Sequence, residues 1–173
     1  TDKITNSRRY SDTDRLSASS NASAITDLLV DLAHSISDTS EDIYGDEGGY
    51  VLAVPSQLFR KASSTYFGVE SNISAKDRFE ITTGFRLVPI NRLNSISNSL
   101  LMDGTSGTSS AALAGKFTPE TAEKILPKPL EFLAPHSDHA GLRSVVPAVC
   151  AIGGLHIYAP LSFAVARNIW ATT

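Results

Sequence analysis

The chain has 173 residues, of which 42% are hydrophobic and 19% charged, and its formal net charge is −3. This length suits one domain or one lobe with a smaller extension, and the negative charge argues against a basic nucleic-acid binder or a partner on an anionic membrane surface. A single cysteine, Cys150, excludes an internal disulfide. No apolar run approaches the roughly 20 residues that span a bilayer, and the polar start of the chain does not resemble a signal peptide.

The first 21 residues are dominated by Ser, Thr, Asn, Asp and Arg. Only Ile4, Tyr10 and Leu16 offer apolar anchors, so the segment cannot bury enough surface to fold alone. It is therefore predicted to be a flexible N-terminal arm, residues 1–21, that lies outside any core.

The next segment carries the strongest helical signal. Apolar residues recur at a spacing of three and four and form one stripe, and they are Ile25, Leu28, Leu29, Leu32 and Ile36. Asn21 and Ser23 are candidate N-caps. The pattern predicts a helix from about Ala22 to Ser37 that packs this stripe on a sheet.

The middle of the chain predicts two strands and a short helix. After an acidic, Gly-rich loop, residues 38–49, the run Tyr50–Val54 is wholly apolar and predicts a buried strand. Ser56 is expected to cap a short helix that continues to Ala62. Residues 63–83 lack a sustained period and predict a long loop. Phe85–Ile90 predicts a strand, and Pro89 places it at an edge.

Most of the second half predicts short strands, and the expected fold class is mixed α+β. Ser109–Ala114 is left open between the start of a helix and a strand against the sheet. Thr118 followed by Pro119 predicts a short helix to about Lys124. The predicted strands are Ser99–Asp103, Leu130–Leu133, a run at 142–152 broken by Pro147, Leu155–Tyr158 and Phe163–Ala166.

Two clusters contain metal-binding residue types. His136, Asp138 and His139 offer imidazole and carboxylate ligands. They fall in a loop, however, and no fixed ligand set is completed there, so a solvent-facing loop is the favoured interpretation. The acidic residues of 38–49 do not match the calcium-loop pattern, which needs Gly at its sixth position and Glu at its twelfth. Counted from Asp38, these positions hold Ile43 and Gly49.

The catalytic patterns fail in the same way. Gly115-Lys116 does not complete a phosphate-binding loop, because the required Gly and Ser/Thr positions hold Ser110 and Phe117. No Gly-x-Ser-x-Gly or Ser-x-x-Lys pattern is present. Cys150 is expected to be buried and inert, and His34 and His156 to be packing residues. The sequence thus predicts no catalytic, cofactor-binding or metal-binding residue, and no enzyme.

The order of elements resembles the C-terminal half of HK97-like major capsid proteins of tailed bacteriophages. The resemblance covers about residues 22–168. A helix is followed by an apolar strand that ends in Pro, and later motifs are similar to strands of that family. The matching motifs are Tyr50–Ser56, Gly84–Ile90, Leu100–Gly104, Gly154–Pro160 and Phe163–Ala166.

The resemblance implies a peripheral-type domain, residues 22–49 and 143–173, with a spine helix and closing strands, and an axial-type domain, residues 50–142. It implies a structural subunit that forms pentamers and hexamers, assembles in the host cytoplasm into an icosahedral virion shell, and encloses double-stranded DNA without sequence specificity. Scaffold, portal or decoration proteins are further expected partners, and a membrane is not. Loops at Gly104–Ser110 are expected to meet at a symmetry axis, and Arg8 and Arg9 to contact DNA weakly.

Two alternatives stay open. One is a small mixed α/β enzyme that uses the loop His136–His139 to bind a metal. The other is a non-viral shell protein or a phage accessory protein of related fold.

Overall fold

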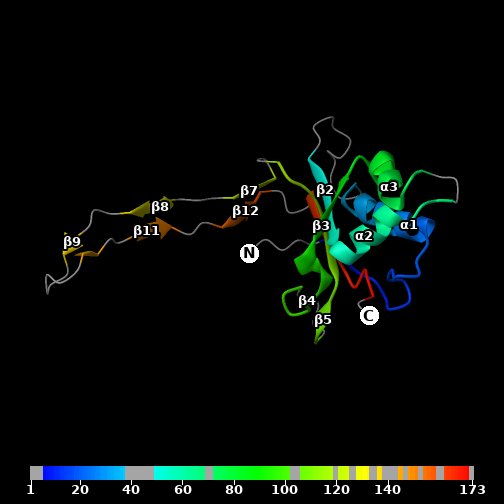
Figure 1. Cartoon of the computed structure of the whole chain (residues 1–173), viewed down its shortest axis with the longest axis horizontal. Coiled ribbons are helices and arrows are strands. Elements are labelled where there is room, and N and C mark those ends of the chain that lie inside the picture. The colour runs from blue at the N-terminus through cyan, green and yellow to red at the C-terminus, as the bar shows by residue number, and fades with distance from the viewer. Residues whose placement is uncertain are drawn as a thin grey trace.

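The computed structural model describes most of the chain, with gaps. The described residues are 6–37, 49–68, 72–101, 106–118, 121–124, 128–132, 136–137, 144–145, 148–151, 154–158 and 162–171. They form a mixed α+β body and a long two-stranded extension (Figure 1).

Helix α1 spans Ala22–Ser37, as the sequence predicts. The Oδ1 of Asn21 accepts a hydrogen bond from the backbone N–H of Ala24 at 2.9 Å, so Asn21 rather than Ser23 caps the helix. The stripe residues Leu28 and Leu32 are buried against the sheet, which contains the closing strand, and this arrangement is also confirmed.

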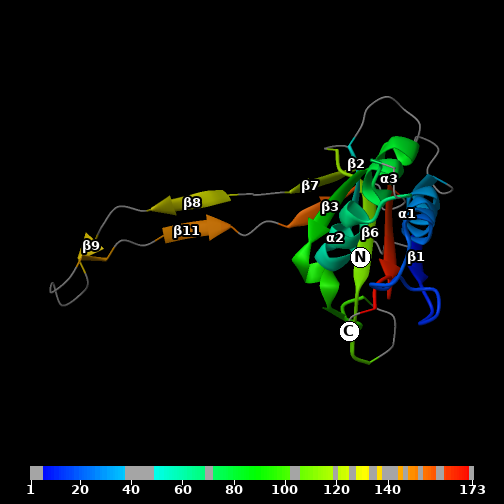
Figure 2. The same cartoon turned by 45° about the vertical axis from the view of Figure 1, so that its right-hand side comes forward.

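The body is built on one mixed sheet with the order β1-β13-β6-β2-β3. Its strands are β1 (Asn6–Arg9), β2 (Tyr50–Pro55), β3 (Arg86–Ile90), β6 (Ala111–Lys116) and β13 (Phe163–Arg167). β1 runs parallel to β13 and β2 parallel to β3, while β6 is antiparallel to both β13 and β2. All three helices cover the same face of this sheet (Figures 1 and 2).

The strands at Tyr50 and Phe85 are confirmed, and β3 lies at the sheet edge, as Pro89 requires. The open question at Ser109–Ala114 is settled in favour of a strand, β6. Its small residues suit a central position, because Ala112 and Ala114 let the helices approach the sheet closely.

The short helix after Pro55 is confirmed as α2, Ser56–Ser64, but its cap is not the predicted one. Ser56 is the first helical residue and donates to Asn94 Oδ1 at 3.3 Å. Asn94 belongs to the short 3-10 helix η1, Asn91–Asn94, and its Oδ1 also accepts from the N–H of Gln57 at 3.4 Å.

The long loop predicted at 63–83 is wrong in its second half, where helix α3 spans Ala75–Thr83. The hydroxyl of Ser74 accepts from the Asp77 N–H at 3.1 Å, while Asp77 reaches back to the N–H of Ser74, which makes a capping box. Gly84 ends the helix in a left-handed conformation with φ 72°. The capping box and Gly84 are local signals of a helix start and end. The hydrophobic period of α3 is weak, so a prediction from the period alone omits the helix.

The flexible arm predicted at 1–21 is wrong for residues 6–21, which belong to the body. β1 pairs with β13, and Tyr10 and Leu16 are 7% and 4% exposed in the hydrophobic core. The segment is too polar to fold alone, but pairing its backbone with an existing strand satisfies its polar groups without needing many apolar side chains.

Two other predicted elements are also wrong. Residues 98–101 form a turn rather than a strand, beside a small hairpin of β4 (Ile96–Ser97) and β5 (Thr108–Ser109). In place of the short helix to Lys124, the residues after Thr121 form strand β7, Ala122–Lys124. β7 becomes a strand because β12 pairs with it, which no local signal reveals.

Antiparallel pairs of short strands carry the chain far from the body as a two-stranded ribbon (Figures 1 and 2). β7 pairs with β12 (Leu155–Ile157), β8 (Lys128–Phe132) with β11 (Ala148–Ala151), and β9 (His136–Ser137) with β10 (Ser144–Val145). The predicted strands near Leu130 and Leu155 are confirmed, whereas Pro147, the site of the predicted break, lies outside the described residues.

The described residues divide into a body and a ribbon. Core residues of α1, β2, α2, α3, β3, β6 and β13 form one cluster, so residues 22–37 and 50–116 share a core. The ribbon, residues 122–157, is the part that stands apart (Figure 1). As an assignment to peripheral-type and axial-type domains of a capsid fold, the division stays a prediction.

Candidate assembly surfaces

The two ends of the described chain are clasped together beside the sheet. After β1 and β13, the N–H of Tyr10 donates to the carbonyl of Arg167 at 3.0 Å, and the N–H of Leu16 donates to that of Ile169 at 2.9 Å. The N–H of Ala171 donates back to Leu16 at 2.8 Å. We call residues 10–16 and 167–171 the terminal clasp. It fixes the edge of the body at which β1 lies.

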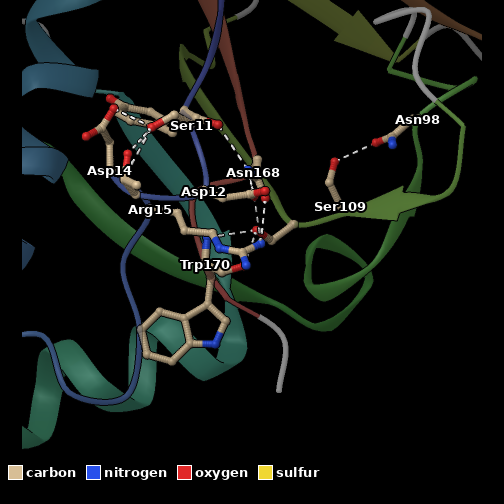
Figure 3. Close-up of polar contacts among 11 residues, drawn as sticks. Ser11, Asp12, Asp14, Arg15, Asn98, Ser109, Asn168 and Trp170 are labelled. Carbon is tan, nitrogen blue, oxygen red and sulfur yellow. Dashed lines mark hydrogen bonds and ion pairs between the residues drawn. The ribbon is translucent and has the colours of Figure 1, made fainter.

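Asn168 holds the centre of the terminal clasp (Figure 3). It is buried and adopts a left-handed backbone with φ 56°, a conformation that Asn tolerates better than most residues. Its Nδ2 donates to the carbonyl of Tyr10 and to Asp12 Oδ1, both at 3.0 Å, and its Oδ1 accepts from Arg15 at 3.2 Å. The side chain therefore links three residues from the other end of the chain.

Charge and hydroxyl groups complete the terminal clasp. The hydrogen bond from Asn168 and the nearby Arg15 lower the pKa of Asp12 below its usual range. The buried hydroxyl of Ser110 accepts from the N–H of Trp170 at 2.8 Å and donates to its carbonyl at 2.9 Å. The clasp is thus a built structural device and offers no open site for a ligand.

Arg8, an expected DNA contact, is engaged within the chain. It forms an ion pair with Asp31 of α1 and lies over the ring of Tyr10. The hydroxyl of Tyr10 also donates to Asp31 at 3.0 Å, and burial together with that hydrogen bond raises the pKa of Tyr10. Arg8 therefore belongs to the packing of β1 against α1.

The stretch expected to meet at a symmetry axis, Gly104–Ser110, is only partly exposed. Residues 104 and 105 lie outside the described residues. Thr108 is exposed, whereas Ser109 and Ser110 are buried. Ser109 donates to Asn98 Oδ1 at 2.6 Å (Figure 3), so the tip of this hairpin, and not its base, is available for contact.

Exposed aromatic and apolar side chains occur where the ribbon leaves the body. Phe117, Leu155 and Tyr158 are 44%, 65% and 51% exposed. His156, a predicted packing residue, is exposed and stacks on Tyr158 with ring centroids 4.4 Å apart. Tyr158 donates to Glu123 on the paired strand at 3.1 Å. Each of these three large side chains is left in water, so this root of the ribbon is a candidate contact surface.

Gly115 allows a close packing contact near the root of the ribbon. A Cβ at Gly115 would overlap the ring of Phe163, which lies across it. Phe163 in turn meets Phe117 edge to face, with centroids 5.2 Å apart. Gly115 therefore leaves room for the Phe163 ring, which is a structural reason for a glycine at this position.

The metal and redox candidates of the sequence lie mostly beyond what the structure describes. Residues 138–139 and 38–48 fall outside it, and for His136 and Cys150 only the backbone strands are described. The ranges given above contain no group of three or more His, Cys, Asp or Glu side chains able to hold a metal ion. Within the same ranges, no helix is long and apolar enough to cross a membrane. His34 is exposed near the end of α1, contrary to the expected packing role.

Comparisons with known proteins connect this geometry to a fold. No family model and no curated protein matches the sequence. The capsid of Myoviridae phage XM1 matches with a TM-score of 0.70 at 11% identity, over 94% of this chain and 50% of that one. The mature capsid of bacteriophage PhiM1 matches with a TM-score of 0.57 at 12% identity, over 97% and 52%. A virus-like particle from Pyrococcus furiosus matches with a TM-score of 0.54 at 14% identity, over 94% and 56%.

The chain has the HK97-like capsid fold. The expected resemblance and the mixed α+β class are both confirmed at this level. The chain spans about half the length of the solved structures it matches. At such low identity the likeness concerns the fold, and it places no residue in a particular contact.

Proposed function

We propose that this chain is a structural subunit of an icosahedral phage capsid, which assembles with copies of itself into a shell that encloses double-stranded DNA. The observation that carries the proposal is the match of nearly the whole chain to a phage capsid subunit with a TM-score of 0.70. In this proposal the chain acts through subunit contacts, so it needs no catalytic, metal or cofactor site.

The ribbon supports a role in assembly on physical grounds. An isolated two-stranded ribbon is marginally stable in water at best, because each strand has one unpaired edge and no third layer. Its root presents Phe117, Leu155 and Tyr158 to solvent. A neighbouring subunit that covered these surfaces would gain apolar contact and would hold the ribbon in its extended form.

In the proposed shell, pentamers and hexamers form the repeating contacts, and the virion is the expected location after assembly in the host cytoplasm. DNA is held by enclosure, so no base-reading motif is required and a net charge of −3 is no obstacle. Of the two arginines proposed to contact DNA weakly, Arg8 is already paired with Asp31. Scaffold, portal or decoration proteins complete the proposed set of partners.

The decisive experiment is electron microscopy and sedimentation of the protein produced from its complete gene. Closed shells are the expected result. Charged substitutions at the exposed Thr108 and at Thr105, which belongs to the same predicted axis loop, should lower shell yield while circular dichroism stays unchanged (Thr105→Glu and Thr108→Glu). A monodisperse monomer that retains a stoichiometric metal would instead support the enzyme that uses the loop His136–His139.

A second candidate function is a non-viral shell protein. The match to the Pyrococcus furiosus virus-like particle favours it, although with the lower TM-score of 0.54. Both functions predict closed shells, so their contents separate them. Packaged long double-stranded DNA in particles from infected or induced cells supports the phage capsid, and shells filled with protein support the alternative.

A further inference from the structure

The sheet of the body has one face that the helices leave open. Along each strand, alternate side chains point to opposite faces. Leu52, Leu87, Ala114 and Ala166 point into the core under the helices. Their neighbours along the strands point to the other side, where the described residues place no α-helix (Figures 1 and 2).

An apolar row crosses this open face. Strand register places Val165 beside Leu113, Leu113 beside Ala53, and Ala53 beside Val88. Val165, Leu113 and Val88 are only half-buried, although they lie in the middle of strands. We call this row, with Val51 next to it, the open sheet face. Ala53 itself is 3% exposed, so the aliphatic surface that no described α-helix covers comes from its half-buried neighbours on four adjoining strands.

Arginines bound the open sheet face, and no acidic residue of these strands joins them. Arg9 and Arg167 lie side by side at the β1 end, and Arg86 lies beside Val51 at the opposite corner. Arg9 and Arg86 are exposed. The Nε of Arg167 is buried and has no hydrogen-bond partner among the described residues. The face is therefore apolar in its middle and positive at its margin.

The opposite side of the body carries a surface of complementary charge. The solvent side of α1 presents Asp27 and Asp31, and His34 is its one basic residue. Small side chains, Ser23 and Ala24, are also exposed there, so the surface is free of bulky obstructions near its start. Asp31 already pairs with Arg8, whereas Asp27 is exposed on the same helix.

We propose that the open sheet face binds the α1 surface of a second copy of this chain, in a head-to-tail contact. Such a contact joins two different surfaces, so each copy offers one of each and the chain of contacts can close into a ring. The ribbon supports this arrangement, because it projects from the sheet on the side away from the helices and would flank the bound copy (Figure 1). The inference rests on the proposed shell function and names the surfaces that such a shell would use.

Two charge-reversed variants test the contact by mixing. In the first, Arg9→Glu and Arg86→Glu reverse the margin of the open sheet face. In the second, Asp27→Lys reverses α1. Each variant alone places like charges across the contact, so assembly should begin only at protein concentrations about tenfold higher or more. In an equimolar mixture, the altered face of each variant meets an opposite charge on the other when the two variants alternate, so rings with an even number of copies, such as hexamers, should recover.

Arg78→Glu, on the exposed side of α3, is the matched control and should assemble normally. Circular dichroism and thermal unfolding establish that every variant is folded. Recovery only in the mixture supports the proposal. If Asp27→Lys alone assembles normally, the proposal is wrong, because α1 then takes no part in the contact. A contact between the open sheet faces of two copies would give this result. Failure of the mixture to form even-numbered rings would overturn it as well.

The same measurements separate this inference from the proposed function. If the unaltered protein forms no shells or rings under any condition, the proposed function fails. If the unaltered protein forms shells and all variants do so equally well, shell formation stands and the head-to-tail contact is wrong. A second apolar variant, Val88→Gln, should weaken assembly without charge reversal, because it removes aliphatic contact from the middle of the row.

Discussion

The body and the ribbon of this protein are held together by different means. In the body, one sheet and three helices enclose a core whose largest side chains, such as Phe79, Ile25 and Leu29, are fully buried. In the ribbon, strands pair only with each other, in short segments with a register shift between Val149 and Ala151. The body can therefore be stable alone, whereas the ribbon depends on what lies next to it. A shell subunit needs both a rigid unit and a surface that is completed by neighbours.

The largest expected difference between the body and the ribbon is in the free energy of local opening. In the isolated chain, trypsin should cleave after Lys124 of the ribbon about a hundredfold faster than after Arg8, Arg9 or Arg15, because local opening costs far less free energy there than in a clasped strand. Mass spectrometry of the first fragments measures this. Early cleavage at Arg8 or Arg9 would mean that the N-terminal segment is the flexible arm after all. In assembled particles the ribbon site should become resistant.

Truncation of the core should be costly. Leu32→Ala removes a side chain that is 3% exposed and should lower the free energy of unfolding by about 2–5 kcal/mol. Leu155→Ala, at the root of the ribbon, is the matched change at 65% exposure and should cost less than about 0.5 kcal/mol in the isolated chain. Denaturant unfolding followed by circular dichroism compares them. Equal costs would show that the ribbon shares the stability of the body.

The terminal clasp should show an intermediate effect. Asn168→Ala removes three side-chain hydrogen bonds and places a less tolerant residue at φ 56°, and it should cost about 1–3 kcal/mol. Asn168→Gly keeps the backbone freedom and should recover part of the loss. If Gly and Ala behave alike, the backbone conformation contributes little. If neither destabilises, the clasp does not hold the two ends of the chain.

The smallest effect concerns acid. Asp12 has a lowered pKa in the folded protein, so its stabilising contribution is present above the unfolded pKa of about 3.9 and disappears as the pH falls through the lower folded-state pKa. Replacement by Asn should therefore flatten the acid limb of the stability curve slightly. Melting temperatures between about pH 5 and pH 2 measure the change. Asp27→Asn, outside the clasp, is the control, and an equal flattening by both would remove the special role of Asp12.

Local patterns were sufficient for much of the body. The stripe of α1, the apolar run of β2 and the Pro at the end of β3 each contain their own structural reason, namely a period, a burial preference or a missing donor. The capping box at Ser74 and the left-handed Gly84 would have revealed α3 as well. The order of these elements was enough to predict an HK97-like fold, because order and approximate spacing survive when sequence identity has fallen to the range of 11–14%.

The sequence by itself determined the helix α1, the main strands and the fold class, because these follow from side chains within a few positions of one another. Only the tertiary structure decided the fate of residues 6–21, the extended ribbon and the open sheet face. β1 exists because β13 supplies a partner more than 150 residues away, and β7 is a strand because β12 lies beside it. Which sheet face the helices cover depends on chain connections between distant elements. Long-range backbone pairing can order even a polar segment, and no local pattern in that segment records it.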